Sequence, residues 1–322
     1  MITFVYGVSG SGKSTLIEQK IKQDIACGKQ VYLVVPEQQT YITERRYTEI
    51  LPPESQLKFE AVNFTRLANI ARRRHGGLCY NYIDGGTKAL LMWKNIREQA
   101  PFLKEYGDAA SSPTRLPSLT DMMLAVINEL KAALLTPTKL ELTAKKLPED
   151  SSLYRRLMDI SLIWSSFSNL IGSDYDDASD DLSALAELLT KHDLFAGYNV
   201  YIDSFTSYTE QEYNVIDMIM KQAANITITV CCEGPGSQHM HFASIAHASN
   251  KLRRLAESRG GSRDVILSEV HRQRHEDLRL VEKYIWQADS KIPESETLSP
   301  KNICVISAKT PYSEAEVAAA RI

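Results

Sequence analysis

Long hydrophobic runs and a strong net charge are both missing from this 322-residue sequence. No apolar stretch approaches the roughly 20 residues that a helix needs to cross a bilayer, which argues against a membrane protein. The formal net charge is -3, so any binding of nucleic acid must use local basic patches. The first residues are typical of a strand rather than of a signal peptide. We therefore expect a cytoplasmic protein with no membrane contact.

Cysteine is sparse, and its spacing forms no metal or disulfide pattern. The five cysteines are odd in number and lack a C-x-x-C pair: Cys27, Cys79, Cys231, Cys232 and Cys304. This pattern predicts reduced, mostly buried thiols. His75 with Cys79, and His271 with His275, are weak metal patterns, but neither has a second ligand pair at zinc-site spacing. Apart from magnesium bound with a nucleotide, we expect no metal site.

A glycine-rich loop near the beginning of the chain is the most specific motif. Residues 2–6 are apolar and favour a strand, and residues 7–14, GVSGSGKS, fit the phosphate-loop pattern G-x-x-x-x-G-K-[ST]. Helical spacing of apolar residues follows until Gly28. Glycines let the backbone N–H groups and the positive end of this helix face a polyphosphate. The predicted nucleotide-binding residues are Gly7, Ser9, Gly10, Ser11, Gly12, Lys13, Ser14 and Thr15.

ATP with Mg²⁺ is the expected ligand of this loop. Lys13 would reach the β- and γ-phosphates, and Ser14 would hold the magnesium ion. Asp203 closes a short apolar strand at residues 199–203 and is a second candidate for binding the nucleotide and its magnesium.

The residue after Asp203 bears on hydrolysis. Motor ATPases of this type usually have a glutamate there to activate the attacking water, whereas this chain has Ser204. Loss of a general base costs about 10²- to 10⁴-fold in rate. Nearby Glu212 is interpreted as the capping-box partner of Thr209. The site is therefore predicted to bind ATP and to turn it over slowly, and no catalytic base is assigned.

Strands and helices alternate at both ends of the chain, which predicts an α/β fold. Further strands are expected at residues 30–35, 59–64 and 226–230, and weaker ones at 265–267 and 303–306. Strands separated by helices imply a parallel sheet with right-handed crossovers, whose ligands bind at the carboxyl ends of the strands.

An all-helical insertion is predicted at residues 85–194, between two parts of the sheet domain at 1–84 and 195–322. Loops are expected at residues 105–118 and 172–180. The second loop contains Asp174, Asp176, Asp177 and Asp180, for which a solvated loop is favoured over a calcium site because the EF-hand glycine and closing glutamate are absent.

Four segments together indicate a family. VYGVSGSGKST, VYLVVPEQQTYITERR, AVNFTRLANIARR and VYIDSFTSYTEQE occur in this order, with the helical insertion between the third and the fourth. The combination resembles the N-terminal part of AddB/RexB, the B subunit of the bacterial ATP-dependent helicase-nuclease that processes double-strand breaks. The resemblance covers residues 1–235 well and is weaker afterwards. The phosphate loop alone is shared by many NTPases, whereas VPEQQT and NFTRLA are specific.

This resemblance implies a RecA-like P-loop NTPase fold of the helicase 1A type, with a 1B-like insertion. It implies that Asp203 corresponds to the aspartate that binds magnesium in this family and that residues 63–68 face DNA. The family's B subunit is helicase-like without being the translocating motor. It binds the displaced single strand and recognises a regulatory DNA sequence, while the A subunit of the heterodimer drives movement. The nuclease domain and iron–sulfur cluster belong to the C-terminal part of longer family members, so this chain is expected to be a fragment.

Basic residues near one sheet edge are the candidate DNA contacts. The helix after residues 59–64 ends in three arginines, and Tyr80 and Tyr82 nearby offer stacking surfaces. Combined with the resemblance, this predicts DNA contacts by Thr65, Arg66, Arg72, Arg73 and Arg74. Other basic helical faces, including those at Arg254 and Arg272, are more typical of solvated surfaces.

Two other functions remain open on the sequence. One is a P-loop small-molecule or nucleoside kinase, although such kinases rarely carry a hundred-residue helical insertion. The other is a non-enzymatic scaffold that uses nucleotide only for stability or for partner docking.

Overall fold

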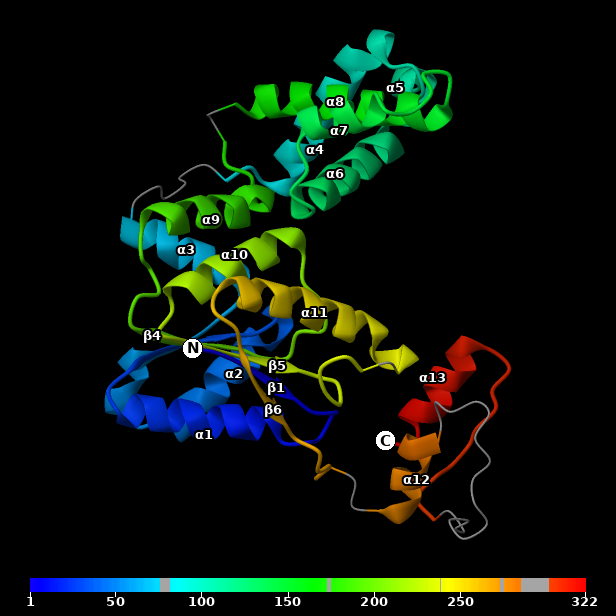
Figure 1. Ribbon diagram of the computed structural model, residues 1–322. Coiled ribbons are helices and arrows are strands. Elements are labelled where there is room, and N and C mark those ends of the chain that lie inside the picture. The colour runs from blue at the N-terminus through cyan, green and yellow to red at the C-terminus, as the bar shows by residue number, and fades with distance from the viewer. Residues whose placement is uncertain (76–81, 173–174, 238, 273–274, 285–300) are drawn as a thin grey trace.

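Six parallel strands form a single sheet in the computed structural model, which describes residues 1–75, 82–172, 175–237, 239–272, 275–284 and 301–322 (Figure 1). The strand order is β3-β2-β4-β5-β1-β6. The predicted α/β class with a parallel sheet is therefore confirmed, and the arrangement is compatible with a RecA-like fold. The strands are β1 (Ile2–Tyr6), β2 (Gln30–Val34), β3 (Phe59–Val62), β4 (Tyr198–Ile202), β5 (Asn225–Val230) and β6 (Arg263–Ile266).

Helices cover both faces of this sheet. On one face lie α1 (Lys13–Ala26) and α2 (Glu37–Ile50), and on the other lie α3 (Phe64–His75), α9 (Asp181–Lys191), α10 (Glu210–Gln222) and α11 (Ala243–Ser258). Alternating side chains of β2 explain both layers. Val31 and Leu33 pack in the cluster of α1 and α2, whereas Tyr32 and Val34 belong to the cluster beneath the other helices.

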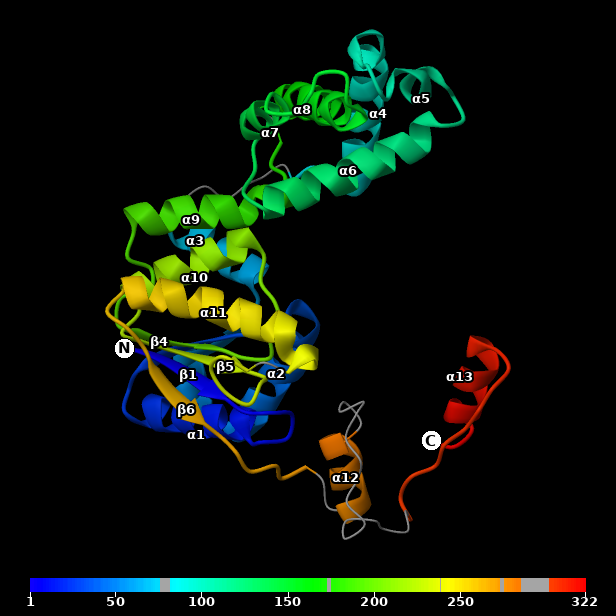
Figure 2. The ribbon, with the colours of Figure 1, turned by 45° about the vertical axis from the view of Figure 1, so that its right-hand side comes forward.

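A helical bundle projects from the sheet domain beyond α9 and α10 (Figures 1 and 2). Its elements are α4 (Gly85–Gln99), η2 (Ala100–Phe102), α5 (Gly107–Ser111), α6 (Leu116–Ala132), α7 (Pro137–Ala144) and α8 (Ser152–Ile171). Asp84, Thr136 and Ser151 cap the beginnings of α4, α7 and α8 by accepting hydrogen bonds from backbone N–H groups. Met92, Met123 and Ile163 are fully buried in a core that belongs to the bundle alone.

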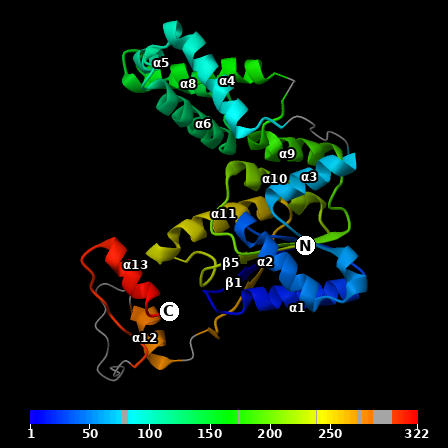
Figure 3. The same ribbon diagram turned by 180° about the vertical axis from the view of Figure 1, so that it is seen from behind.

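Short elements complete the chain. The 3-10 turns η1 (Pro53–Lys58), η3 (Ala178–Asp180) and η4 (Met240–Phe242) precede β3, α9 and α11. Two last helices, α12 (Glu276–Tyr284) and α13 (Pro311–Ala319), lie beyond β6 and away from the helical bundle (Figure 3). Among the described residues, no helix is both long and apolar enough to span a membrane.

Several local expectations are corrected. Residues 105–118 contain α5 and the beginning of α6 rather than a loop, because buried Asp159 of α8 accepts hydrogen bonds from the backbone N–H groups of residues 104–106. Residues 303–306 form no strand. Of the four described cysteines only Cys232 is buried, so the prediction of mostly buried thiols was wrong for them. Cys79, Tyr80 and Asp174 lie outside the described residues.

Helix α9 falls within the range predicted for the insertion, yet it packs on the sheet domain. Its Leu185, Ala186 and Leu189 are buried in the same cluster as β1 and β4. The acidic segment before it is not a solvated loop, because Asp177 is buried beside two lysines. The bundle with its own core therefore consists of α4 to α8.

Candidate nucleotide-binding site

The phosphate loop lies where β1 ends and α1 begins, at the carboxyl edge of the sheet. Gly10 and Gly12 have φ angles of 80° and 85°, in the left-handed region that favours glycine. Gly7 is required for a different reason: a Cβ atom there would lie 2.2 Å from the Ser11 hydroxyl oxygen. These glycines therefore let the loop fold tightly against the first turn of α1.

Lys13 and Ser14 begin helix α1 and have separate partners. The Lys13 ammonium donates hydrogen bonds to the carbonyl oxygens of Gly7, at 2.6 Å, and Val8, at 2.9 Å. The Ser14 hydroxyl donates to Oδ2 of Asp203, also at 2.9 Å. The structure thus brings together the two residues that were predicted to hold magnesium, although 189 positions separate them in sequence.

Asp203 is held in place at the end of β4. Its other oxygen, Oδ1, accepts hydrogen bonds from the Thr229 hydroxyl of β5 and from the Ser204 backbone N–H at 2.9 Å. Ser204 has a φ of 69°, an uncommon conformation for a residue with a side chain. The carboxylate is therefore fixed toward α1, and Oδ2 is the oxygen that faces Ser14.

The nearby glutamates are engaged away from Asp203. Glu212 and Thr209 form the predicted capping box at the beginning of α10, with the Thr209 N–H donating to Glu212 at 2.7 Å. Burial raises the pKa of Glu212. Glu210 forms an ion pair with Lys251 of α11. Among the described residues that line the cavity at the phosphate loop, Asp203 is the only carboxylate.

This cavity has a volume of about 830 Å³ and includes residues that the sequence did not assign to nucleotide binding. After β6 pairs with β1, the chain crosses the loop, and the His271 N–H donates to the Gly10 carbonyl at 2.9 Å. The Arg272 guanidinium donates to the Ser9 hydroxyl at 3.3 Å, so it is not on a remote helix surface as expected. The weak strand predicted at residues 265–267 was the only sequence signal for this placement. Thr229 of β5 and Cys231, which directly follows this strand, line the same cavity.

The predicted DNA contacts lie on and around α3, and the structure separates them into two groups. Thr65, Arg73 and Arg74 are exposed, and Arg66 is partly exposed while it pairs with Glu44 and Glu60. Thr65, Arg66 and Arg73 line a hollow of about 310 Å³ at the carboxyl edge of β3.

Arg72 differs from its neighbours. Its side chain is buried, lies 2.8 Å from Oδ1 of Asp181 and donates a hydrogen bond to the Tyr82 hydroxyl. The expectation that Arg72 contacts DNA is therefore corrected, because its guanidinium joins α3 to α9 inside the protein.

Comparisons with known proteins agree with the resemblance seen in the sequence. Proteins named as the B subunit of an ATP-dependent helicase/deoxyribonuclease are similar to this chain. The one from Acetivibrio thermocellus is 30% identical over 264 residues, covering 80% of this chain and 23% of that protein. The one from Thermoanaerobacter sp. strain X514 is 28% identical over 331 aligned residues, covering 100% of this chain and 28% of that protein.

The relative from Clostridium novyi is 29% identical over 324 residues, which are 97% of this chain and 28% of that protein. The chain thus spans about a quarter of the length of the curated relatives it matches. A family described as "ADDB, N-terminal" matches residues 4–282. The chain therefore belongs to the AddB N-terminal family.

Proposed function

We propose that this chain binds ATP with Mg²⁺ in the cavity above the phosphate loop, as the helicase-like part of the B subunit of an ATP-dependent helicase/deoxyribonuclease. The observation that carries the proposal is the contact of 2.9 Å between the Ser14 hydroxyl and Asp203, beside a lysine held at the loop. Hydroxyl and carboxylate oxygens suit Mg²⁺, so these two residues would hold the ion. When bound, Mg²⁺ supplies positive charge to the phosphate oxygens.

The protein's own groups favour binding over hydrolysis. Lys13, the N-terminus of α1 and Arg272 bring positive charge to the cavity. By contrast, Glu210 and Glu212 are engaged in an ion pair and a helix cap, so neither takes the position of a general base. We expect ATP turnover to be slow, by about 10²- to 10⁴-fold relative to a site with such a base.

A thermal melt with and without Mg-ATP tests the nucleotide site. Ligand at 100 times its dissociation constant adds about 2.7 kcal/mol to the free energy of unfolding, and a rise of several degrees in Tm is expected. Lys13→Ala should remove this rise without unfolding the protein, whereas Lys20→Ala on the same helix should keep it. An unchanged ATP affinity in Lys13→Ala would contradict the proposal.

Phosphate release measured in the same samples tests whether the chain hydrolyses ATP and whether DNA stimulates the hydrolysis. Negligible release, insensitive to single-stranded DNA, is the expected result. Fast DNA-stimulated release would mean that another group replaces the missing glutamate, and the proposed weak motor would be wrong.

Single-stranded DNA is the proposed polymer ligand, bound by the exposed part of α3. Thr65, Arg66 and Arg73 line the hollow at the carboxyl edge of β3, and exposed Arg74 adds a further positive charge on the same helix. Each arginine–phosphate pair that is removed should reduce the slope of log affinity against log salt by about 0.7. The double variant Arg73→Ala/Arg74→Ala should therefore bind single strands more weakly with a shallower slope, while Arg254→Ala on α11 should not.

The relatives' name implies a partner subunit, and we propose an A subunit as the partner of the full protein in double-strand-break repair. Family membership supports this role over that of a small-molecule kinase. ATP turnover that depended on a small acceptor would favour the kinase instead. DNA binding that is independent of nucleotide and unchanged by Lys13→Ala would favour the scaffold.

A further inference from the structure

The helical bundle and the sheet domain have separate hydrophobic cores. The cluster inside α4 to α8 shares no residue with the two clusters of the sheet domain. The bundle approaches the sheet domain chiefly where α6 meets η3 and α10. Its direction therefore depends on the contacts at this junction more than on shared apolar packing.

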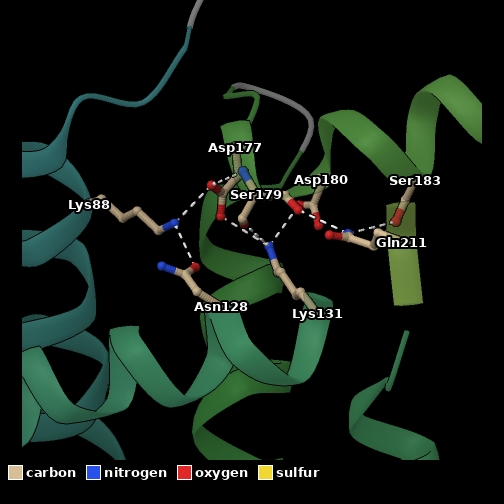
Figure 4. A network of polar contacts seen from close by, with 8 residues as sticks. All are labelled: Lys88, Asn128, Lys131, Asp177, Ser179, Asp180, Ser183 and Gln211. Atoms are coloured by element: carbon tan, nitrogen blue, oxygen red, sulfur yellow. Dashed lines mark hydrogen bonds and ion pairs between the residues drawn. The ribbon is translucent and has the colours of Figure 1, made fainter. Parts of the chain in front are cut away.

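Charged side chains fill the junction (Figure 4). Lys88 of α4 lies 2.8 Å from Oδ1 of Asp177, and Lys131 of α6 lies 3.0 Å from Oδ2 of the same carboxylate. Lys131 also contacts Asp180 at 2.7 Å and the Ser179 hydroxyl at 3.0 Å. The Asp177 side chain is only 7% exposed, and the two lysines are 14% and 13% exposed.

The acidic side of this cluster is attached to the sheet domain. The Gln211 side chain of α10 donates hydrogen bonds to the Ser179 carbonyl at 3.2 Å and to the Ser183 hydroxyl of α9 at 3.0 Å. Figure 4 shows the resulting chain of contacts, which runs from Lys88 and Lys131 through Asp177 and Ser179 to Gln211. Two helices of the bundle are thereby bound to two helices that pack on the sheet.

We propose that Lys88, Lys131, Asp177 and Asp180 form a latch that fixes the direction of the helical bundle and that, when released, lets the bundle reorient. Polar interfaces between domains allow relative motion more readily than apolar ones. Lysine and aspartate side chains are well solvated when exposed, so opening this junction exposes groups that water can satisfy. The separate cores let both bodies stay folded while the latch is open.

The latch can be tested by single-molecule energy transfer in the full chain. Dyes are attached through non-natural amino acids at positions 23 on α1 and 149 between α7 and α8, so the native cysteines are not involved. Wild type should give one narrow distance distribution. Lys88→Met/Lys131→Met should give a broadened or shifted distribution, with helix content by circular dichroism unchanged.

Matched controls separate the latch from general charge loss. Lys94→Met/Lys145→Met removes two lysines of the same bundle that form exposed pairs with Glu98 and Glu141, and it should leave the distribution narrow. Lys131→Arg keeps the positive charge, so the distance distribution of this variant should also stay narrow.

If the double methionine variant loses helix content, the distance distribution is measured in Asp177→Asn instead. This substitution keeps the shape of the side chain and removes its charge, and it should broaden or shift the distribution. A wild-type distance distribution in a folded latch variant would overturn the proposal, since the direction of the bundle would then be set by other contacts.

Discussion

The Ser11 hydroxyl is a buried polar group inside the phosphate loop. It has no hydrogen-bond partner among the described residues and lies where a side chain at position 7 would have to go. An unsatisfied buried hydroxyl costs about 1–3 kcal/mol. The loop thus keeps a buried hydroxyl that neither donates nor accepts a hydrogen bond among the described residues.

Two substitutions in the loop should have opposite effects on stability. Ser11→Ala should leave the free energy of unfolding unchanged or raise it by about 1 kcal/mol, because it removes the unpaired hydroxyl. Gly7→Ala should lower it by about 1–3 kcal/mol, because the new Cβ would also lie 3.1 Å from the Leu267 carbonyl. Urea denaturation measures both. A marked loss of Mg-ATP binding in Ser11→Ala would show that this hydroxyl faces the ligand instead.

At the scale of elements, α10 connects the phosphate-loop site with the helical bundle. It begins seven residues after Asp203, at Glu210, and its Gln211 binds the acidic segment before α9. The Thr209 capping box fixes where the helix starts. The beginning of this one helix therefore supports two separate regions of the molecule.

Removing the cap should weaken this helix end. Thr209→Ala should cost about 1 kcal/mol of unfolding free energy, because the Glu212 N–H loses its acceptor. Thr209→Ser keeps the hydroxyl and should stay near wild type. Chemical denaturation provides the measurement, and equal stability of the two variants would contradict the role of the cap.

The contacts of Asp177 with Lys88 and Lys131 should make the free energy of unfolding depend on pH in the acidic range. Burial alone would raise the pKa of Asp177, but the hydrogen bond from Lys88 and the charge of Lys131 outweigh it and hold the pKa well below its usual range. A lowered pKa contributes stability above the unfolded value of about 4, and this stability is lost as the pH falls further. Wild type should therefore lose stability below pH of about 4 more steeply than Asp177→Asn.

Denaturation curves at a series of pH values measure this difference. At neutral pH Asp177→Asn should be the less stable protein, because Lys88 and Lys131 lose their shared partner. Parallel curves for the two proteins from neutral to acidic pH would contradict the assignment.

At the scale of the whole molecule, the helical bundle should be removable. The Ile83 N–H donates to the Asp176 carbonyl at 3.0 Å, so the two chain segments that enter and leave the bundle are adjacent there. Replacing residues 84–175 by a short glycine–serine linker should leave a folded sheet domain. The shortened chain also carries Asp177→Asn and Asp180→Asn, because the deletion removes the lysine partners of these two carboxylates. Retention of the Tm rise with Mg-ATP is the expected result, and an unfolded product by circular dichroism would contradict it.

The parallel sheet and the meeting of Ser14 with Asp203 could be predicted because both follow from local patterns. The loop motif identifies one strand end, and carboxyl ends of parallel strands share an edge. Contacts between distant charges could not be predicted in this way. Asp177 lies 89 residues from Lys88, and Arg272 lies 263 residues from Ser9, so no local pattern links them. Arg72 was assigned to DNA for the same reason, since its partner Asp181 is on another helix.

The position of β1 inside the sheet also sets an order of events during translation. Its neighbours are β5 and β6, where Ile2 pairs with Ile226 and Thr3 with Arg263. At about 5–20 residues per second, the ribosome needs roughly 10–45 s to make the 220 or so residues between β1 and its first neighbour. The helical bundle, whose buried core residues run from Met92 to Ile171, is complete well before then. The core residues of the bundle are therefore synthesised while the apolar strand that leads into the phosphate loop still lacks both of its neighbours in the sheet.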